Sequence, residues 1–182
     1  MSNNKKRCSW CNEKNPLYVE YHDKEWGVRC FSDEYLFEML LLESFQAGLS
    51  WECVLNKRES FRTAYMGFDY RAIALFGDEK IDELMSTPGI IHSRRKIAAS
   101  IKNARVFLSI IEEFGSFYGY LCSFTNGECF TEVGKTKSEL SERISRDLSA
   151  RGMTFVGSVI IYSFLQAVGI VYSHERECFL YK

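Results

Sequence analysis

The sequence contains little proline and no long apolar run. Only two of its 182 residues are proline, Pro16 and Pro88, and this scarcity of helix breakers favours a mostly helical fold. No apolar stretch reaches the ~18 residues that predict a membrane-spanning helix. The basic start, MSNNKKRCSW, is followed by no apolar segment, so it does not resemble a secretory signal. We therefore expect a globular protein with no membrane-embedded part.

The sequence also lacks an excess of charge of either sign, since its formal net charge is −1. A total near zero neither requires nor excludes nucleic acid as a partner, because a local basic patch matters more than the sum. The 7 cysteines are odd in number and mostly scattered through helical patterns. This distribution favours a reduced, cytoplasmic protein over a disulfide framework. In that compartment, clustered Cys and His residues indicate a metal site.

The spacing of apolar residues predicts an all-α fold of about eight helices. The first 30 residues carry no such pattern, and Asn15-Pro16 indicates a turn among them. Helices are predicted from Asp33 to about Gly48, from Ser50 to about Tyr65, from Asp69, from Asp78 to about Met85, from Ser93, from Thr136 to about Gly152, and from about Val156 to Val168. Ser50, Asp69 and Asp78 are the expected N-caps, and Thr136 with Glu139 has the spacing of a capping box.

Residues with metal-binding chemistry gather at the two ends of the chain. Cys8, Cys11 and His22 lie near the start, whereas His174 and Cys178 form an H-x3-C spacing near the end. Tetrahedral zinc prefers mixed sulfur and nitrogen ligands, and four protein ligands make a closed, structural site. Such an ion would tie together two chain ends that are too short and polar to be held by burial. The spacing leaves open whether Cys8 or Cys11 is the ligand, and whether these residues instead have separate roles.

The segment TPGIIHSRRKI, which joins two predicted helices, resembles a helix-hairpin-helix element. A tight glycine turn exposes backbone N–H groups at the start of the second helix, where they and the helix dipole can hold a phosphate. Such contacts position a DNA duplex without reading its sequence. The expected DNA-binding residues are Gly89, Ile91, Arg94, Arg95 and Lys96. His92 is expected to be a polar surface residue, and the alternative for the whole segment is an ordinary helical corner with a solvated basic face.

Five segments occur in one order along nearly the whole chain, from Cys8 to Cys178: YHDKEWGV, LLESFQAGLSW, GIIHSRRKI, FVGSVIIYSFLQAVGIV and the terminal H-x3-C. Together they closely resemble the 3-methyladenine DNA glycosylase I family, bacterial base-excision repair enzymes of the helix-hairpin-helix superfamily. The resemblance implies an all-α, two-lobed fold with the active-site pocket between the lobes. Residues 1–32 and 112–182 would form a zinc-bearing lobe, and residues 33–111 the helix-hairpin-helix lobe.

The resemblance also implies one structural zinc ion that joins the two termini. The family's ligands match Cys8, His22, His174 and Cys178. Cys11 has no counterpart in the family's pattern, so the resemblance decides against it as a ligand.

The family's base pocket matches Tyr21, Glu43 and Trp51 of this sequence, with Trp10 and Trp26 close by. These residue types suit the recognition of a flipped, alkylated base. Aromatic walls stack on an extruded base, and electron-rich rings attract the cationic ring of 3-methylated adenine in DNA. The Glu43 carboxylate can accept hydrogen bonds from the exocyclic amine, and it is the expected catalytic residue. The alternative is that Glu43 pairs with a buried arginine or caps a helix.

The resemblance implies a monofunctional glycosylase. The long helix after the hairpin has no acid before Glu112, which agrees with a family that lacks the aspartate found in most of the superfamily. A cationic methyladenine leaves as a neutral base, so it needs no protonation, and we predict hydrolysis by water. No lysine lies at a recognisable nucleophile position, and no lyase step is expected. Phe45 and Cys122 depart from the family's pattern, and Phe45 could narrow the pocket.

The implied partners are double-stranded DNA containing alkylated bases and free 3-methyladenine as the product. We expect a monomer in the bacterial cytoplasm. The competing hypothesis is a zinc-stabilised DNA-binding module without catalysis, which would release no base from methylated DNA.

Overall fold

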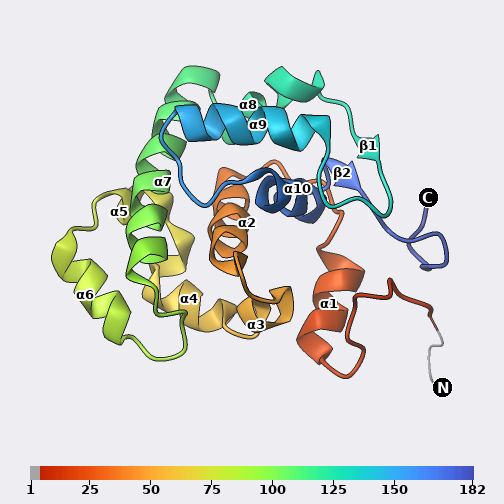
Figure 1. The fold of residues 1–182 in the computed structure, drawn as a ribbon, viewed down its shortest axis with the longest axis horizontal. Coiled ribbons are helices and arrows are strands. Elements are labelled where there is room, and N and C mark those ends of the chain that lie inside the picture. Colours follow the sequence, from red (N-terminus) through yellow and green to blue (C-terminus); the bar gives the residue numbers. More distant parts are fainter. Residues whose placement is uncertain (1–4) are drawn as a thin grey trace.

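A computed structural model describes residues 5–182, which form ten α-helices, one 3-10 helix and two short strands (Figure 1). In chain order the elements are α1 (Pro16–Lys24), α2 (Asp33–Gln46), α3 (Trp51–Leu55), α4 (Arg58–Ala64), η1 (Met66–Phe68), α5 (Tyr70–Ala74), α6 (Asp78–Ser86), α7 (Arg94–Phe114), α8 (Phe117–Thr125), β1 (Phe130–Thr131), α9 (Glu139–Ala150), α10 (Ser158–Ala167) and β2 (Val171–Tyr172). The fold is mostly helical, as predicted, and β1 and β2 add one small parallel pair. Along residues 5–182, no helix is both long and apolar enough to cross a membrane.

The helix α2 lies at the centre of the fold (Figure 1). It begins where predicted, because the Ser32 side chain accepts a hydrogen bond from the Tyr35 N–H and two acids follow in the first turn. Every residue from Leu36 to Phe45 is buried, so the helix is covered all round rather than along one stripe. It packs against α3, α7, α8 and α10. Any polar group on this helix therefore needs a partner inside the protein or a ligand.

The prediction that the first 30 residues are irregular is wrong, because α1 occupies part of them. Pro16 is the first residue of this helix, where its missing N–H has no intrahelical partner to lose. The Asn15 side chain caps the first turn. Asn-Pro therefore starts a helix here and does not form a turn. The buried residues of α1 are Tyr18, Tyr21 and His22.

The helix predicted from Ser50 to Tyr65 is divided into α3 and α4. Ser50 caps α3 as expected, but the helix ends at Asn56. The side-chain oxygen of Asn56 accepts a hydrogen bond from Nδ2 of Asn15 at 2.9 Å. The helix is thus interrupted between α3 and α4 where a distant segment contacts it, and the helix propensity of the local residues does not predict this interruption.

Two predicted helix starts are displaced by one or two residues. Asp69 caps α5 as predicted, whereas Gly77 precedes α6 and Asp78 is already helical. The capping box of α9 is formed by Ser138 and Ser141, not by Thr136 with Glu139. The helix α8, capped by Ser116, was not predicted.

The segment that follows Trp26 crosses the end of α10 closely. The Gly27 N–H donates to the carbonyl oxygen of Gln166 in α10 at 3.1 Å. The Cys30 N–H donates to that of Val168, the C-cap of α10, at 3.2 Å. Gly169 lies at this crossing with a φ of +72°, and a Cβ there would be 2.5 Å from the backbone nitrogen of Arg29. Glycine is required both by the left-handed conformation and by the approach of the two backbones.

We expect Gly169→Ala to lower the free energy of unfolding by about 2–4 kcal/mol, because left-handed backbone strain adds to the displacement of a packed segment. The matched control is Gly115→Ala at the end of α7, which shares a positive φ of +79° but has no atom within 4 Å of the added Cβ. That variant should lose only ~1 kcal/mol from strain. Urea unfolding measures both, and equal losses would contradict the close approach.

Candidate functional site

A cavity of about 300 Å³ lies where the first part of the chain meets its end. The N-terminal part of its lining is mainly aromatic, and the C-terminal part is polar. The volume is that of a small-ligand pocket. The lining residues are Trp10, Tyr18, Tyr21, Trp26, Glu43, Gln46, Trp51, Gly134, Lys135, Ser163, Gln166, Ser173 and Glu175.

The structure brings together the four aromatic residues predicted to bind a base. Tyr21 comes from α1, Trp51 is the first residue of α3, and Trp10 and Trp26 come from the segments that flank α1. The ring centroids of Tyr21 and Trp51 are 5.2 Å apart, and those of Trp10 and Trp26 are 4.7 Å apart. Two helices and two flanking segments thus present rings to one cavity, which can hold a flat group against them.

Two buried acids of α2 have opposite environments. Glu38 accepts hydrogen bonds from Arg58 at 2.7 Å and from Arg62 at 2.8 Å, so its charge is compensated. Glu43 is 3% exposed, and its Oε2 has no hydrogen-bond partner in the described chain. The alternative that Glu43 pairs with a buried arginine is therefore wrong for residues 5–182, since the arginines of α4 pair with Glu38.

Burial raises the pKa of Glu43 well above the ordinary value for a glutamate. Nε1 of Trp51 is likewise buried without a partner among residues 5–182. Nearby, the pKa of Tyr21 is raised well above its usual range, first by burial and then by Glu43. Unpaired buried donors and acceptors are rare in proteins, and two of them that line one cavity can bind a polar ligand there. The cavity therefore offers stacking surfaces, the unpaired Trp51 N–H and the Glu43 carboxyl group to a planar guest.

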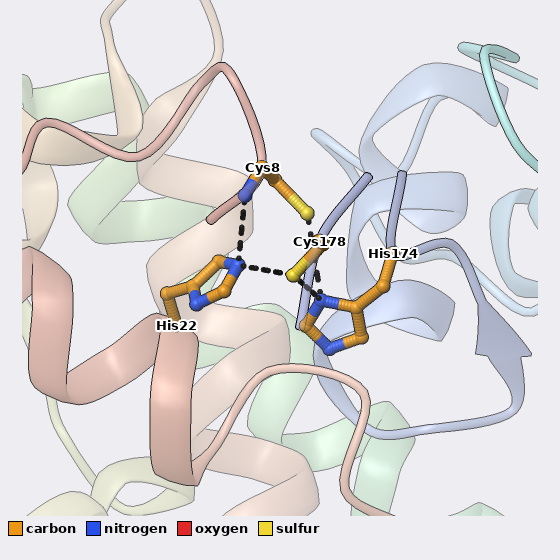
Figure 2. A group of neighbouring side chains, drawn as sticks. All are labelled: Cys8, His22, His174 and Cys178. Atoms are coloured by element: carbon orange, nitrogen blue, oxygen red, sulfur yellow. Dashed lines mark hydrogen bonds between the residues drawn. The ribbon is translucent and has the colours of Figure 1, made fainter. Parts of the chain in front are cut away.

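The four residues predicted to bind metal form one buried group (Figure 2). Donor atoms of Cys8, His22, His174 and Cys178 all lie within 4.8 Å of one another. Nδ1 of His174 is 3.4 Å from Sγ of Cys8 and 3.5 Å from Sγ of Cys178. Tetrahedral zinc, with bonds of about 2.3 Å to sulfur and 2.0–2.1 Å to nitrogen, separates such ligands by ~3.5 Å. The side chains present therefore fit a tetrahedral metal ion.

The surroundings of this group also fit a metal ion. Nδ1–H of His22 donates to Asp23 at 2.8 Å, and Asp23 accepts two further bonds from Arg7 at 2.8 and 2.7 Å. A carboxylate behind a histidine fixes the nitrogen that faces the ion. Burial raises the pKa of Cys8 to about 12 and lowers that of His174 to about 4. His174 is thus neutral, as a ligand must be, and a cation would hold Cys8 as the thiolate.

Cys11 lies outside this group. Its thiol is directed to the carbonyl oxygen of Tyr18, at 3.7 Å. The structure therefore agrees with the choice of Cys8 over Cys11 that the family resemblance implied.

The Cys and His group and the cavity are in direct contact. The Trp26 ring packs edge-on against His174 at 4.7 Å, and Trp10 lies 5.2 Å from His22. Ser9 donates two hydrogen bonds of 2.7 Å to Glu175, which lines the cavity. The two ends of the chain thus meet at the Cys and His group. Trp10, Trp26 and Glu175, which lie beside this group, line the cavity.

The hairpin turn needs glycine at its tip. Gly89 has a φ of +85°, and a Cβ there would lie 2.5 Å from Oγ of Ser60. Ser93 precedes α7 without making a side-chain capping bond, so the first N–H groups of α7 have no side-chain cap. His92 is exposed, as predicted, and its ring nitrogen lies 2.6 Å from the Thr87 carbonyl oxygen. Ile91 packs partly buried against the core.

The three basic residues after the turn differ in their contacts. Arg94 pairs with Asp82 of α6. Arg95 is exposed, with its guanidinium 5.9 Å from the Phe155 ring. Lys96 instead directs its ammonium into the protein, where it donates to the carbonyl oxygens of Phe45 and Ala47.

Sequence reasoning did not predict the polar part of the cavity or Tyr18 and Gln46. Tyr18 lies three residues before Tyr21 on the same helix, and Gln46 lies three residues after Glu43, so helical spacing could have found both. The polar residues come from α10 and from the segments that follow β1 and β2, and they carry no signal of their own. Phe45 does not narrow the cavity, because it packs in the core against Phe61 at 4.8 Å. Cys122 is not among the lining residues either.

Comparisons with known proteins agree with this geometry. A profile of the family described as methyladenine glycosylase matches residues 10–181. DNA-3-methyladenine glycosylase 1 of Escherichia coli (strain K12) is 41% identical over 181 residues, 96% of each chain. A crystal structure of 3-methyladenine DNA glycosylase I has a TM-score of 0.91 and 40% identity, over 97% of this chain and all of the other.

A second solved structure is that of a Tyr-to-Phe variant of 3-methyladenine DNA glycosylase I in complex with 3-methyladenine. It has a TM-score of 0.91 and 33% identity, and the match covers 95% of this chain and 96% of the other. With a family profile and a 41% identical relative that both span nearly the whole sequence, the chain belongs to the methyladenine glycosylase family.

Proposed function

We propose that this protein is a DNA glycosylase that releases 3-methyladenine from alkylated double-stranded DNA, the first step of base-excision repair. The observation that carries the proposal is Glu43, a buried carboxyl without a partner, in a cavity walled by aromatic rings. The relatives support it, since they are named as 3-methyladenine glycosylases and one is solved with that base.

The cavity chemistry matches this substrate. A glycosylase extrudes its target base, and a damaged base leaves the stack at lower cost. The flipped ring would stack against the aromatic wall to which Tyr21 and Trp51 belong, and its positive charge would gain cation–π attraction. Glu43 would accept a hydrogen bond from the exocyclic amine and, once ionised, would offset the positive charge of the base. An unmethylated adenine has the same ring system but lacks the methyl group and the charge, so the pocket would favour the alkylated base.

Cleavage by this route requires no protonated leaving group. The cationic base departs as a neutral molecule, and water takes its place on the sugar carbon. Glu43, which contacts the base, is the proposed catalytic residue. Its effect is to hold the base in the orientation in which departure is easiest.

The DNA backbone would lie along the hairpin. Gly89 and the uncapped start of α7 suit a phosphate, and Arg95 is the basic side chain most free to add charge there. We further propose the two-lobed division of the family, with residues 33–111 bearing the hairpin and residues 1–32 and 112–182 bearing the metal. Residues 1–4 lie outside the described chain.

We propose that the Cys and His group binds one structural zinc ion. The donor set, the spacing and the Asp23 support behind His22 favour this metal. An ion bound there would close the chain ends and hold Trp10 and Trp26 in place. We also propose that the protein is a monomer in the bacterial cytoplasm, and sedimentation of the purified protein as a dimer would contradict the monomer.

We expect Glu43→Gln to reduce release of 3-methyladenine from methylated DNA at least tenfold, because a hydrogen bond to a charged group contributes about 1.5–3 kcal/mol. The matched control, Glu112→Gln, changes an exposed acid of α7 and should release base like the wild type. Chromatography of the freed base measures both variants, and the same samples should show intact abasic strands. Normal release by Glu43→Gln would remove this residue from the mechanism.

The same substitution should stabilise the protein at neutral pH. Because burial raises the pKa of Glu43, the folded state keeps a proton that the unfolded state loses above about pH 4.3. The wild type should therefore lose stability relative to Glu43→Gln as the pH rises, by up to ~1.4 kcal/mol per pH unit until the folded-state pKa is reached. Urea unfolding at several pH values measures this difference, and a difference independent of pH would show that the carboxyl is not desolvated.

Cys178→Ala should lose most of its zinc and unfold at a lower temperature, because three ligands bind a structural ion far more weakly than four. Cys11→Ala, which removes a buried thiol outside the group, should keep about one zinc ion per chain. Elemental analysis and thermal unfolding report the two effects. A full complement of zinc in Cys178→Ala would reject this ligand.

A further inference from the structure

The contacts of Lys96 separate it from its basic neighbours. Its Nζ donates to the carbonyl oxygen of Phe45 at 2.8 Å and to that of Ala47 at 2.6 Å, both from a partly buried position. The Phe155 ring lies 6.0 Å away. No acid among residues 5–182 pairs with the ammonium, and burial lowers the pKa of Lys96 below its ordinary value. The charge is therefore compensated chiefly by the two carbonyl dipoles.

These carbonyls belong to the C-terminal end of α2. The last carbonyls of a helix have no intrahelical partner and carry partial negative charge. The last turn of α2 contains no basic residue of its own, and Ala47 is its C-cap. Lys96, which lies 49 residues further along the chain from Ala47, supplies the missing cap from the first turn of α7.

The end of α2 is also the part of the fold that arranges the cavity. Glu43 and Gln46 lie on its last turn, and the turn formed by residues 47–50 leads directly to Trp51. Gly48 within this turn has a φ of +82° and no neighbours within 4 Å of an added Cβ. Residues 48–50 are exposed. Besides the hydrogen bond from the Leu49 N–H to the Gln46 carbonyl oxygen, the two bonds from Lys96 anchor this turn to α7.

We propose that Lys96 is a positioning residue of the base pocket, which joins the hairpin helix to the end of α2, and is not a phosphate contact. Adjacent residues of one helical turn then have separate tasks: Arg95 faces the DNA backbone, and Lys96 holds the pocket beneath it. The inference rests on the proposed function and differs from the DNA contact that the sequence alone predicts for Lys96.

The experiment compares Lys96→Met with the matched neighbour Arg95→Met. Binding of free 3-methyladenine is followed by the fluorescence of the cavity tryptophans. Binding of a duplex with a stable abasic-site analogue is followed across a range of salt concentrations. We expect Lys96→Met to weaken binding of the free base roughly tenfold and to leave the salt slope of DNA binding unchanged. Arg95→Met should bind the free base normally and lose ~0.9 from the salt slope, the value of one phosphate contact.

A wild-type affinity of Lys96→Met for the free base, together with a shallower salt slope, would overturn the proposal. If Lys96→Met does not fold, Lys96→Gln replaces it, because its amide keeps two donors without the charge. The proposal then predicts an unchanged salt slope, whereas a phosphate contact predicts the same loss as for Arg95→Met.

Amide hydrogen exchange separates this proposal from the proposed function. Faster exchange in residues 47–53 of Lys96→Met, but not of Arg95→Met, supports the anchor without any ligand. Equal exchange in the two variants would contradict it. Failure of the wild type to bind 3-methyladenine would reject the proposed function and leave the exchange result to decide the role of Lys96.

Discussion

The burial of α2 is the constraint on which the rest of this structure depends. Because residues Leu36 to Phe45 have no solvent-facing side, each polar group on the helix must find a partner inside the protein. Glu38 has two arginines from α4, whereas Glu43 has none in the described chain and opens on the cavity. The fold thus keeps one uncompensated carboxyl at its centre. Such a group opposes folding and is retained where a ligand can use it.

The contacts that join the two chain ends also form part of the cavity wall. His22 and Tyr21 are neighbours on α1, and His174 packs against Trp26. The Trp26 ring therefore lies where the N-terminal segment meets the segment after β2, whereas Tyr21 packs against Trp51 of α3. This explains why residues of metal-binding and base-binding chemistry alternate within a few positions of the sequence. A bound ion would add rigidity where a cavity wall built from irregular segments has few regular hydrogen bonds.

The hairpin, which we propose faces the DNA, meets the cavity at the end of α2. The backbone there is anchored by Lys96, and it leads into the turn that presents Trp51. A duplex held at the start of α7 would therefore lie close to the residues that receive the extruded base. The end of α2 and the side chain of Lys96 connect the hairpin directly to the cavity.

The sequence by itself determined the family, the central and hairpin helices, and the residue types of both sites. Glycine at the hairpin tip, a Ser cap before α2 and the Cys and His spacings are local signals, and each keeps its meaning in the structure. Tertiary structure alone decided the rest. The break between α3 and α4 accompanies a hydrogen bond from Asn15 to Asn56. The backbone of Arg29 can approach the end of α10 because residue 169 is glycine. Glu38 and Glu43 have the same residue type on one apolar helix, and Arg95 and Lys96 are consecutive cations. Their different roles come from partners that lie far away in the sequence, which no local pattern records.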